Sequence, residues 1–493
     1  MKEEVIGVCI GEATPGEASF ISRTVSRSGE YVTLDFDGRL ILGMVEGLVR
    51  GSPSISGDIL DPDVVEQILK FEGEGGQYIK GKVRLLGDVE SLEIPKTPPP
   101  PGTKIMRADP SVLQRIFSGG TIRLGRLLSH PEVVVSVDAN KMVSRHLAIL
   151  AITGAGKSNT VSVIVEELIK LNGMPILFDM HSEYGEAGFS KVKRIKPRLN
   201  PIYLSFPEFK ILVDVGKDAY IQERLLRKAF KAAKENIKGG GNFIPRILDE
   251  LEAIAGSAEQ MTGSEKNAIA GVINKVEDFE NRYEGLVDPH APHILSEFEQ
   301  GAANVVDLGA VDEDYADVIV SHVLRKTLHM RRSGEMPPVF CIIEEAHILA
   351  PAKRQTHSKY WIDRIAREGR KFGVGLCLVS QRPKSLDQNS LSQANNTIIM
   401  RLVEPSDQRH VQQASERLSD DLLGQLNALN TGEAVVVGMM TRIPALVKID
   451  RFKGKLRGSD PDITALWAER AAEKQRQHKQ KKKEVKDLYE GMI

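Results

Sequence analysis

The sequence predicts an α/β protein with a mainly parallel sheet, preceded by a smaller β-rich domain. Three observations predict this fold: a strand, loop and helix pattern over residues 147–173, strand-like apolar runs alternating with helical stretches after residue 300, and β-rich runs between glycine turns before residue 98. The 493 residues, 41% of them hydrophobic, suffice for about two to four domains with ordinary cores.

The first segment, residues 1–97, carries short β-rich runs at 5–10, 31–36, 40–49 and 78–86. Their spacing and glycine turns predict a small antiparallel β-barrel or sandwich. Four consecutive prolines from Pro98 to Pro101 open the next segment, so residues 98–118 are expected to form a stiff, extended linker.

A phosphate-binding loop is predicted after the apolar run 147–151. Its glycines let backbone N–H groups approach an anion, Lys157 can reach the β- and γ-phosphates, and Ser158 can bind Mg²⁺ at a helix N-terminus. The nucleotide is ATP or GTP, with ATP expected. The residues expected to contact it are Thr153, Gly154, Ala155, Gly156, Lys157, Ser158 and Asn159.

The loop departs from the usual motif at Ala151, where glycine is common. A chance match is the alternative, but apolar positions at 161, 164, 165, 168 and 169 follow helical spacing, and Gly173 stands where a helix would stop. This context favours a nucleotide site.

The core is predicted in two parts, residues 119–215 and 301–450, separated by a helical insertion over 216–300. The first part includes a β-rich stretch at 122–137 and a strand at 175–178. The second part carries strand signals at 305–308, 339–343, 375–379, 397–402 and 434–437.

Two adjacent carboxylates, Glu344 and Glu345, follow the strand at 339–343. Ligands of parallel sheets gather at the carboxyl ends of strands, so we assign Glu344 to Mg²⁺ and Glu345 to the attacking water. Two acids could instead only begin a helix, whose dipole favours them.

Another acid, Asp179, ends the strand after the phosphate-binding loop. It is expected either to orient water or to support a residue that contacts the bound ligand. His181 and Glu183 nearby could ligate a transition metal, but a third ligand is not apparent, and Mg²⁺ prefers oxygen.

Arginines recur at 364, 367 and 370, between two of the predicted strands. Such an arginine can neutralise γ-phosphate charge from a neighbouring subunit, and Gln381, at the end of the next strand, is placed to sense that phosphate. Ordinary surface charge is the alternative for any one of them.

A basic loop follows the paired acids and contains Lys353 and Arg354. We expect both to contact DNA phosphates without reading bases, the alternative being an ordinary exposed loop. The net charge of −1 neither supports nor excludes DNA. A second basic run, around Lys479 to Lys486, is expected to be a solvated helix.

Composition narrows the class of protein further. The three cysteines lie far apart in apolar runs, which excludes a zinc cluster or a disulfide framework. No apolar stretch approaches the length that spans a bilayer, and the N-terminus lacks a signal-peptide pattern, so a cytoplasmic protein without membrane contact is expected.

With these motifs the chain resembles the archaeal HerA family, within the FtsK/HerA branch of RecA-like P-loop ATPases. The likeness extends over nearly the whole chain and rests on residues 145–150, 179–184, 343–347, 364–373, 380–383 and 454–461. Glu344 departs from the aspartate of many relatives, without loss of the functional group.

The resemblance implies a HerA-type β-barrel, a RecA-like core with a helical insertion, and a C-terminal arm over residues 451–493 that braces the next subunit. It implies a homohexamer with double-stranded DNA in its central channel, and a NurA-type nuclease on the barrel face, acting in end resection for double-strand break repair. It also places Arg145 and Arg370 at the nucleotide across a subunit interface, and Gly454 and Lys455 near the nucleotide.

Two other functions remain open at this point. The chain could be a ring ATPase that acts on protein, or a ring that serves as a scaffold for a nuclease without moving DNA.

Overall fold

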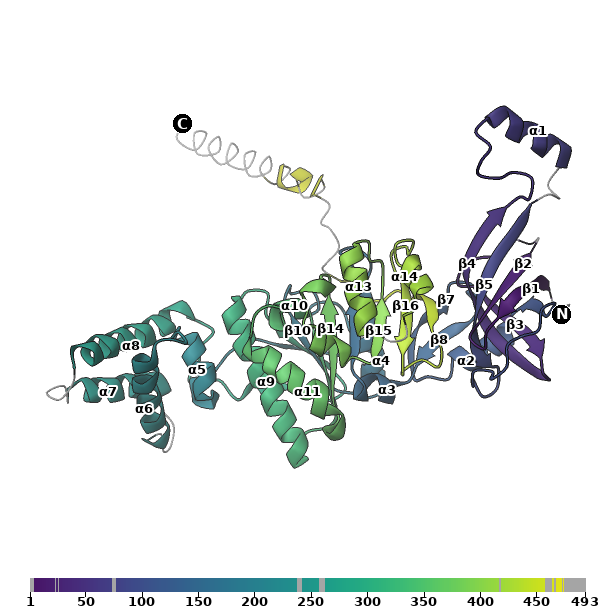
Figure 1. Cartoon of the computed structure of the whole chain (residues 1–493). Helices are drawn as coiled ribbons and strands as arrows, with labels where there is room; N and C mark the ends of the chain where they lie inside the picture. Colours follow the sequence, from purple (N-terminus) through teal and green to yellow (C-terminus); the bar gives the residue numbers. More distant parts are fainter. Residues whose placement is uncertain are drawn as a thin grey trace, which may run out of the picture.

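The computed structural model consists of a β-barrel at one end, a large sheet in the middle and a group of helices at the far end (Figure 1). It describes residues 4–22, 24, 26–72, 77–236, 242–256, 262–415, 418–456, 463–464, 467–471 and 473.

The N-terminal domain is a closed barrel with the strand order β1-β2-β5-β4-β3-β6. Its strands are β1 (Val5–Ala13), β2 (Glu17–Ser22), β3 (Tyr31–Phe36), β4 (Arg39–Gly51), β5 (Tyr78–Asp88) and β6 (Lys104–Arg107). Alternate residues of these strands, including Phe20, Val32 and Leu34, fill the interior.

The barrel corrects the expected linker at 98–118. Strand β6 lies inside that range and closes the barrel by pairing with both β1 and β3, and helix α2 (Pro110–Phe117) follows it. Only the proline run itself is extended chain. The four residues of β6 are too few for a recognisable alternation, so their strand pairing depends on the partners on both sides.

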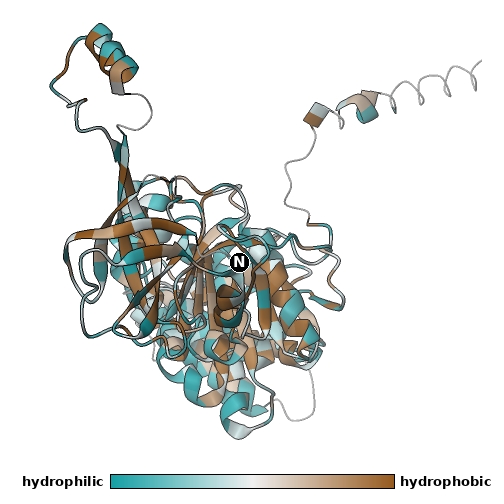
Figure 2. Ribbon diagram, turned by 90° about the vertical axis from the view of Figure 1, so that its right-hand side faces the viewer, coloured by the Kyte–Doolittle hydropathy of each residue, from teal (hydrophilic) through white to brown (hydrophobic). Residues whose placement is uncertain are grey.

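Strands β4 and β5 continue past the barrel as a paired arm, and helix α1 (Pro62–Glu72) lies at its tip (Figure 1). The tip carries apolar residues that contact water: Leu60 is 93% exposed and Phe71 95%. Figure 2 shows brown and teal residues side by side on this isolated helix. The sequence pattern did not predict either the arm or its helix.

The central sheet has eleven strands in the order β11-β12-β10-β13-β14-β9-β15-β16-β17-β7-β8. Seven of them, from β11 to β15 in this order, run parallel to their neighbours: β9 (Leu147–Leu150), β10 (Pro175–Asp179), β11 (Val192–Ile195), β12 (Ala303–Asp307), β13 (Val339–Ile343), β14 (Val374–Ser380) and β15 (Asn396–Ile399). The strands expected in the core are confirmed within a few residues.

Four antiparallel strands extend the sheet beyond β15: β16 (Glu433–Gly438), β17 (Ala445–Ile449), β7 (Ile122–Leu127) and β8 (Val134–Val137). The β-rich stretch at 122–137 therefore joins the core sheet by pairing with β17, a strand that the sequence analysis missed.

Helices cover the sheet, and its central strands are buried along their whole length. The helices of the core are α3 (Ala139–Ser144), α4 (Lys157–Lys170), α9 (Glu313–Ser333), α10 (Ala346–Leu349), α11 (His357–Glu368), α12 (Gln388–Ser392), α13 (Pro405–Ala414) and α14 (Asp420–Gln425). In the described part of the chain, no helix combines the length and apolar character needed to span a membrane.

The insertion contains helices α6 (Tyr220–Asn236), α7 (Phe243–Gly256) and α8 (Gly263–Arg282), as expected for a helical subdomain. Four phenylalanines pack together in its centre with ring centroids 5.2 to 6.3 Å apart: Phe209, Phe230, Phe243 and Phe279. Phe209 belongs to α5 (Phe206–Leu212), which lies between the insertion and α9.

A buried ion pair joins α5 to α9. Arg325 donates two hydrogen bonds to Glu208, from Nε to Oε1 at 3.1 Å and from Nη2 to Oε2 at 3.0 Å. Burial raises the pKa of Glu208, but His322 and Arg325 outweigh it and hold that pKa at about 2. The insertion is therefore anchored to the core by a charged contact.

Of the expected C-terminal arm, residues 451–456 are described, together with the short stretches given above. The basic run around Lys479 lies outside the described residues, as does the 458–461 motif.

Candidate nucleotide site

The phosphate-binding loop joins the carboxyl end of β9 to the first turn of α4. Gly154 and Gly156 have φ angles of 76° and 108°, a region that glycine enters without strain. A Cβ on Gly156 would approach the side chain of Met400 at 3.0 Å. Ala151 is buried and has no positive φ, so the departure from glycine at this position costs no strain.

Lys157 and Glu345 form an ion pair across the sheet edge, with Nζ 2.5 Å from Oε1. Glu345 stands in the left-handed region (φ 45°, ψ 45°) directly after β13, which turns its buried side chain back towards the loop. His347 Nδ1 lies 3.2 Å from its other oxygen. Burial raises the pKa of Glu345, but His347 and Lys157 outweigh it and bring the pKa to about 2, so the carboxylate stays ionised.

The neighbouring acid, Glu344, points into the protein. Its Oε1 accepts a hydrogen bond from the Tyr184 hydroxyl at 3.0 Å, and its Oε2 is buried without a partner. Burial raises the pKa of Glu344 to about 8. Its unpartnered oxygen leaves one position open for a further donor, such as a water of a hydrated cation.

Ser158, the expected Mg²⁺ ligand, donates a hydrogen bond to Glu183 Oε2 at 2.6 Å. Sequence reasoning considered Glu183 only for a transition metal and missed this contact with the loop. Glu183 is four residues after Asp179, and nothing in the local pattern marks it as a partner of Ser158. Thr153 similarly donates to Gln381 Oε1 at 2.6 Å, which brings the expected phosphate sensor to the loop.

The carboxylate of Asp179 binds the backbone of the loop that follows it. Asp179 is fully buried, and its carboxylate accepts backbone N–H groups of His181, Glu183 and Tyr184 at 2.8 to 3.3 Å. Asp179 therefore shapes the loop that carries Glu183. An acid at a strand end gives the same sequence signal in either role.

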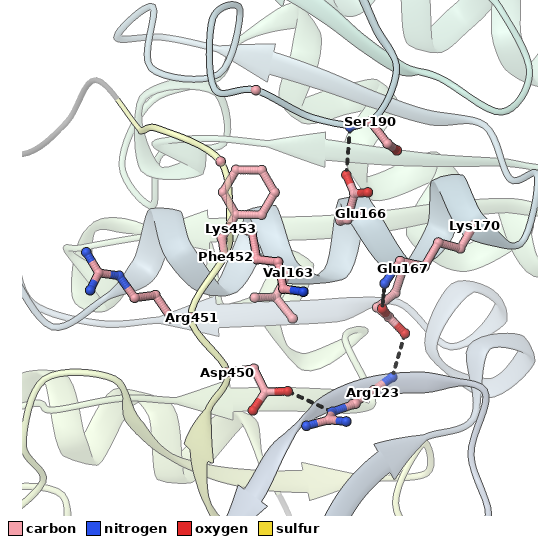
Figure 3. A pocket seen from close by; sticks show the side chains of 12 residues that line it. Arg123, Val163, Glu166, Glu167, Lys170, Ser190, Asp450, Arg451, Phe452 and Lys453 are labelled. Atoms are coloured by element: carbon pink, nitrogen blue, oxygen red, sulfur yellow. Dashed lines mark hydrogen bonds and ion pairs between the residues drawn. The ribbon is translucent and has the colours of Figure 1, made fainter.

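The side chain of Asn159, an expected nucleotide contact, is bonded to the segment after β17. Its amide donates to the carbonyl of Asp450 and accepts the N–H of Phe452, both at 2.9 Å. These bonds hold the segment after β17 against α4. Figure 3 shows residues 450–453 beside the part of α4 that carries Val163. This segment lines a groove of about 610 Å³ along α4.

The same segment carries Gly454 and Lys455, and both lie against the loop after β10. A Cβ on Gly188 would meet Gly454 Cα at 3.4 Å and the Lys455 N atom at 3.5 Å. Their place beside α4 is compatible with the expected position near the nucleotide.

Arg145 and Arg370 lie at the amino ends of the parallel strands, whereas the phosphate-binding loop lies at their carboxyl ends. Arg145 ends α3 just before β9, and Arg370 belongs to a 3₁₀ turn (Gly369–Phe372) just before β14. These strands are parallel and adjacent. Four residues of β9 alone span about 13 Å, so neither arginine reaches the phosphate-binding loop of its own subunit.

The three arginines expected on one helix are also divided by the structure. Arg364 lies over the Trp361 ring and pairs with Glu368, and Arg367 bonds the carbonyl of Asp363. Arg370 stands beyond the end of α11 and is exposed. Among the described residues, no ion pair or hydrogen bond occupies its guanidinium.

The basic loop residues have different surroundings. Lys353 is exposed, whereas Arg354 pairs with Glu313 Oε2 at 3.0 Å. Arg354 also lines a cavity of about 450 Å³ that includes Glu345, Gln381 and His347. The structure therefore places Arg354 beside the candidate catalytic acid.

These groups fit a magnesium nucleotide. The loop supplies backbone N–H groups and one ammonium for phosphates. The Ser158 hydroxyl and the unpartnered oxygen of Glu344 supply oxygen atoms of the kind that Mg²⁺ and its bound water prefer. Glu345, ionised and next to a cavity, can accept a proton from a water molecule.

Two family models match the chain: "Helicase HerA, central domain" over residues 122–327, and "HAS barrel domain" over residues 6–91. A DNA double-strand break repair helicase HerA from Sulfurisphaera tokodaii is 42% identical over 94% of this chain and 96% of the relative. The protein of that name from Saccharolobus solfataricus is 40% identical over 94% and 95%.

Solved structures share the fold at low sequence identity. VirB4 of Thermoanaerobacter pseudethanolicus superposes with a TM-score of 0.52 and 16% identity, covering 69% of this chain and 98% of that one. The plasmid coupling protein TrwB, in complex with a non-hydrolysable GTP analogue, also gives 0.52, with 13% identity over 72% and 95%.

Proposed function

The chain belongs to the HerA helicase family and is an ATP hydrolase, and from this premise we propose that it moves along double-stranded DNA as a homohexameric ring. In this proposal it acts with a NurA-type nuclease in DNA end resection. Relatives named as DNA double-strand break repair helicases support the DNA substrate.

ATP hydrolysis requires phosphate binding, charge neutralisation and an activated water. In our proposal Lys157 leaves Glu345 to pair with the β- and γ-phosphates, which frees the carboxylate to accept the proton of the attacking water. Ser158, together with Glu344 through water, would hold Mg²⁺, which would supply charge neutralisation when bound. Thr153 and Gln381, already in contact, respond to the γ-phosphate.

The observation that carries the ring proposal is the separation of Arg145 and Arg370 from the loop of their own subunit. Both lie at the amino ends of the parallel strands, while Lys157, Glu345 and Gln381 lie at the carboxyl ends. If the amino ends of the strands of one subunit face the carboxyl ends of the strands of its neighbour, these arginines reach the nucleotide bound to the neighbour. A closed ring repeats that contact at every interface.

Lys353 is the best placed of the described residues for a non-specific DNA contact in this proposal. It is exposed in the loop between α10 and α11 and lies eight residues after Glu345, so the nucleotide state can be transmitted to it along a short stretch of chain. Arg354, paired with Glu313, would join it once that pair opens.

The arm formed by β4, β5 and α1 supports a partner on the barrel face. Leu60 and Phe71 at its tip are almost fully exposed, which is a property of protein interaction sites. We assign this tip to the nuclease.

ATP turnover measured with and without linear duplex DNA tests the function. Stimulation by duplex DNA is expected. Unstimulated turnover would favour a ring ATPase acting on protein, and normal end processing by a hydrolysis-deficient ring would favour a scaffold.

A further inference from the structure

The side chains of Ser158 and Glu183 form a short contact that the proposed mechanism has not used. The hydroxyl of Ser158 donates to Glu183 Oε2 at 2.6 Å, and both residues are partly buried. A serine that binds a cation does so through a lone pair of its oxygen, so its proton still needs an acceptor. Glu183 supplies that acceptor.

The loop that carries Glu183 is fixed by several independent contacts. Asp179 accepts its backbone N–H together with those of His181 and Tyr184. Ser182 has a φ of 57°, and its hydroxyl donates to Asp307 at 2.6 Å. Gly309 packs against Ser182 so closely that a Cβ there would approach its Oγ to 2.3 Å. The position of Glu183 is thus set by the fold.

Glu344 does not perform this task in the structure. Its Oε1 is occupied by the Tyr184 hydroxyl, and its Oε2 has no partner, whereas the Ser158 proton goes to Glu183. Tyr184 follows Glu183 directly, so one loop positions both an acceptor for Ser158 and a donor for Glu344.

We propose that Glu183 is a positioning residue for Mg²⁺ binding: it accepts the Ser158 proton and thereby directs a lone pair of the serine oxygen towards the cation. This inference rests on the proposed use of Mg²⁺ with ATP. In this proposal the two carboxylates have different roles: Glu183 orients the serine, and Glu344 faces the water around the ion.

The test is a Mg²⁺ titration of fluorescent ADP binding to the full-length protein, with EDTA as the metal-free reference. Glu183→Ala is expected to raise about tenfold the Mg²⁺ concentration that gives half of the full change in ADP binding. This is the loss typical of a hydrogen bond to a charged group. ADP affinity in EDTA is expected to stay unchanged. Glu183→Gln should recover most of the Mg²⁺ response, because its amide oxygen can accept the same proton.

A double variant shows whether Glu183 acts through Ser158. Ser158→Ala removes the hydroxyl, so adding Glu183→Ala to it should cause no further loss. Additive losses would overturn the proposal, as would an unchanged Mg²⁺ response in Glu183→Ala. Glu183→Met, a side chain of similar length whose thioether is only a weak acceptor, replaces Glu183→Ala if the latter does not fold.

Glu186→Ala is the matched control, since Glu186 lies in the same loop and pairs with Arg194 at 3.1 Å. Its Mg²⁺ response should equal that of the unmodified protein, and an equal loss there would overturn a specific role for Glu183. The titration needs no DNA, so absent DNA stimulation would refute the proposed translocase and leave this result standing.

Discussion

Glu345 Oε1 lies 2.5 Å from Lys157 Nζ, although 188 residues separate the two in the chain. The pair neutralises the ammonium that phosphates would otherwise attract, and it keeps the carboxylate ionised in a buried site. Nucleotide binding must therefore exchange one anionic partner of Lys157 for another.

Substitution of each partner should separate binding from turnover. Lys157→Ala is expected to weaken ATP affinity about tenfold to a hundredfold and to abolish hydrolysis, because it removes a charge-assisted phosphate contact. Glu345→Gln should bind ATP at least as well as the unmodified protein, since Lys157 is no longer paired, yet turn over at least about a hundredfold more slowly. Nucleotide titration and phosphate release measure the two effects, and equal loss of affinity in both variants would contradict these roles.

Arg370 is expected to act across a subunit interface. Rings mixed from Arg370→Ala and Lys157→Ala subunits contain some interfaces with both residues intact, so their ATPase activity should exceed that of either pure variant. Absence of recovery, with mixing verified by differently tagged subunits, would place the arginine in its own subunit's site. Arg367→Ala, on the preceding helix, should retain activity and serves as the control.

The two basic loop residues should differ in what they change. Lys353→Ala is expected to weaken duplex binding at every sequence and to lower the salt slope by about 0.9 for each phosphate that the lysine no longer neutralises. Arg354→Ala, which opens the Glu313 pair beside the Glu345 cavity, should mainly change DNA-stimulated turnover. Binding at several salt concentrations and ATPase assays with DNA distinguish them. Unchanged salt slopes in both variants and in their combination would move the DNA contact elsewhere.

The arm tip is expected to bind the nuclease through its apolar residues. Leu60→Ser with Phe71→Ser should weaken capture of a purified NurA-type nuclease at least about thirtyfold, the effect of losing an interface hot spot, without changing basal ATPase activity. Tyr220→Ser, 74% exposed on the distant insertion, is the control. Equal nuclease binding by both variants would exclude the tip.

The Glu208–Arg325 pair should stabilise the attachment of the insertion. Glu208→Gln leaves the Arg325 charge partly buried without its partner, so we expect a loss of about 3 kcal/mol, against about 0.5 kcal/mol or less for the more exposed Glu223→Gln. Thermal unfolding measures the difference, and equal effects would contradict it.

Low pH should remove the stabilisation that the Glu208–Arg325 pair provides. The pKa of Glu208 is lowered from 4.5 to about 2 in the folded protein, so the unfolded state binds more protons between these values. The stabilisation is therefore fully present above pH 4.5 and is lost as the pH falls towards 2. Glu208→Gln should show a shallower loss of stability over this range.

Local sequence patterns were sufficient to predict much of the fold and part of the candidate site. The glycines before Lys157, the apolar run before Glu345 and the strand before Gln381 each report on their own conformation, and the parallel sheet then brings these residues to one edge. Strands β6 and β17 were missed because short strands depend on partners distant in sequence. The roles of Asp179, Asn159 and Glu183 depend on which neighbour each side chain meets, and spacing does not contain that information.

The pairing of β7 with β17 has a consequence for the order of folding. Strands β1 to β6 end at residue 107, so the barrel has all its strands early in synthesis. Strand β7, which follows after helix α2, pairs with β8 and with β17 at residues 445–449. The central sheet cannot be completed until the ribosome has made residue 449, and its nascent edges stay open to wrong partners until then.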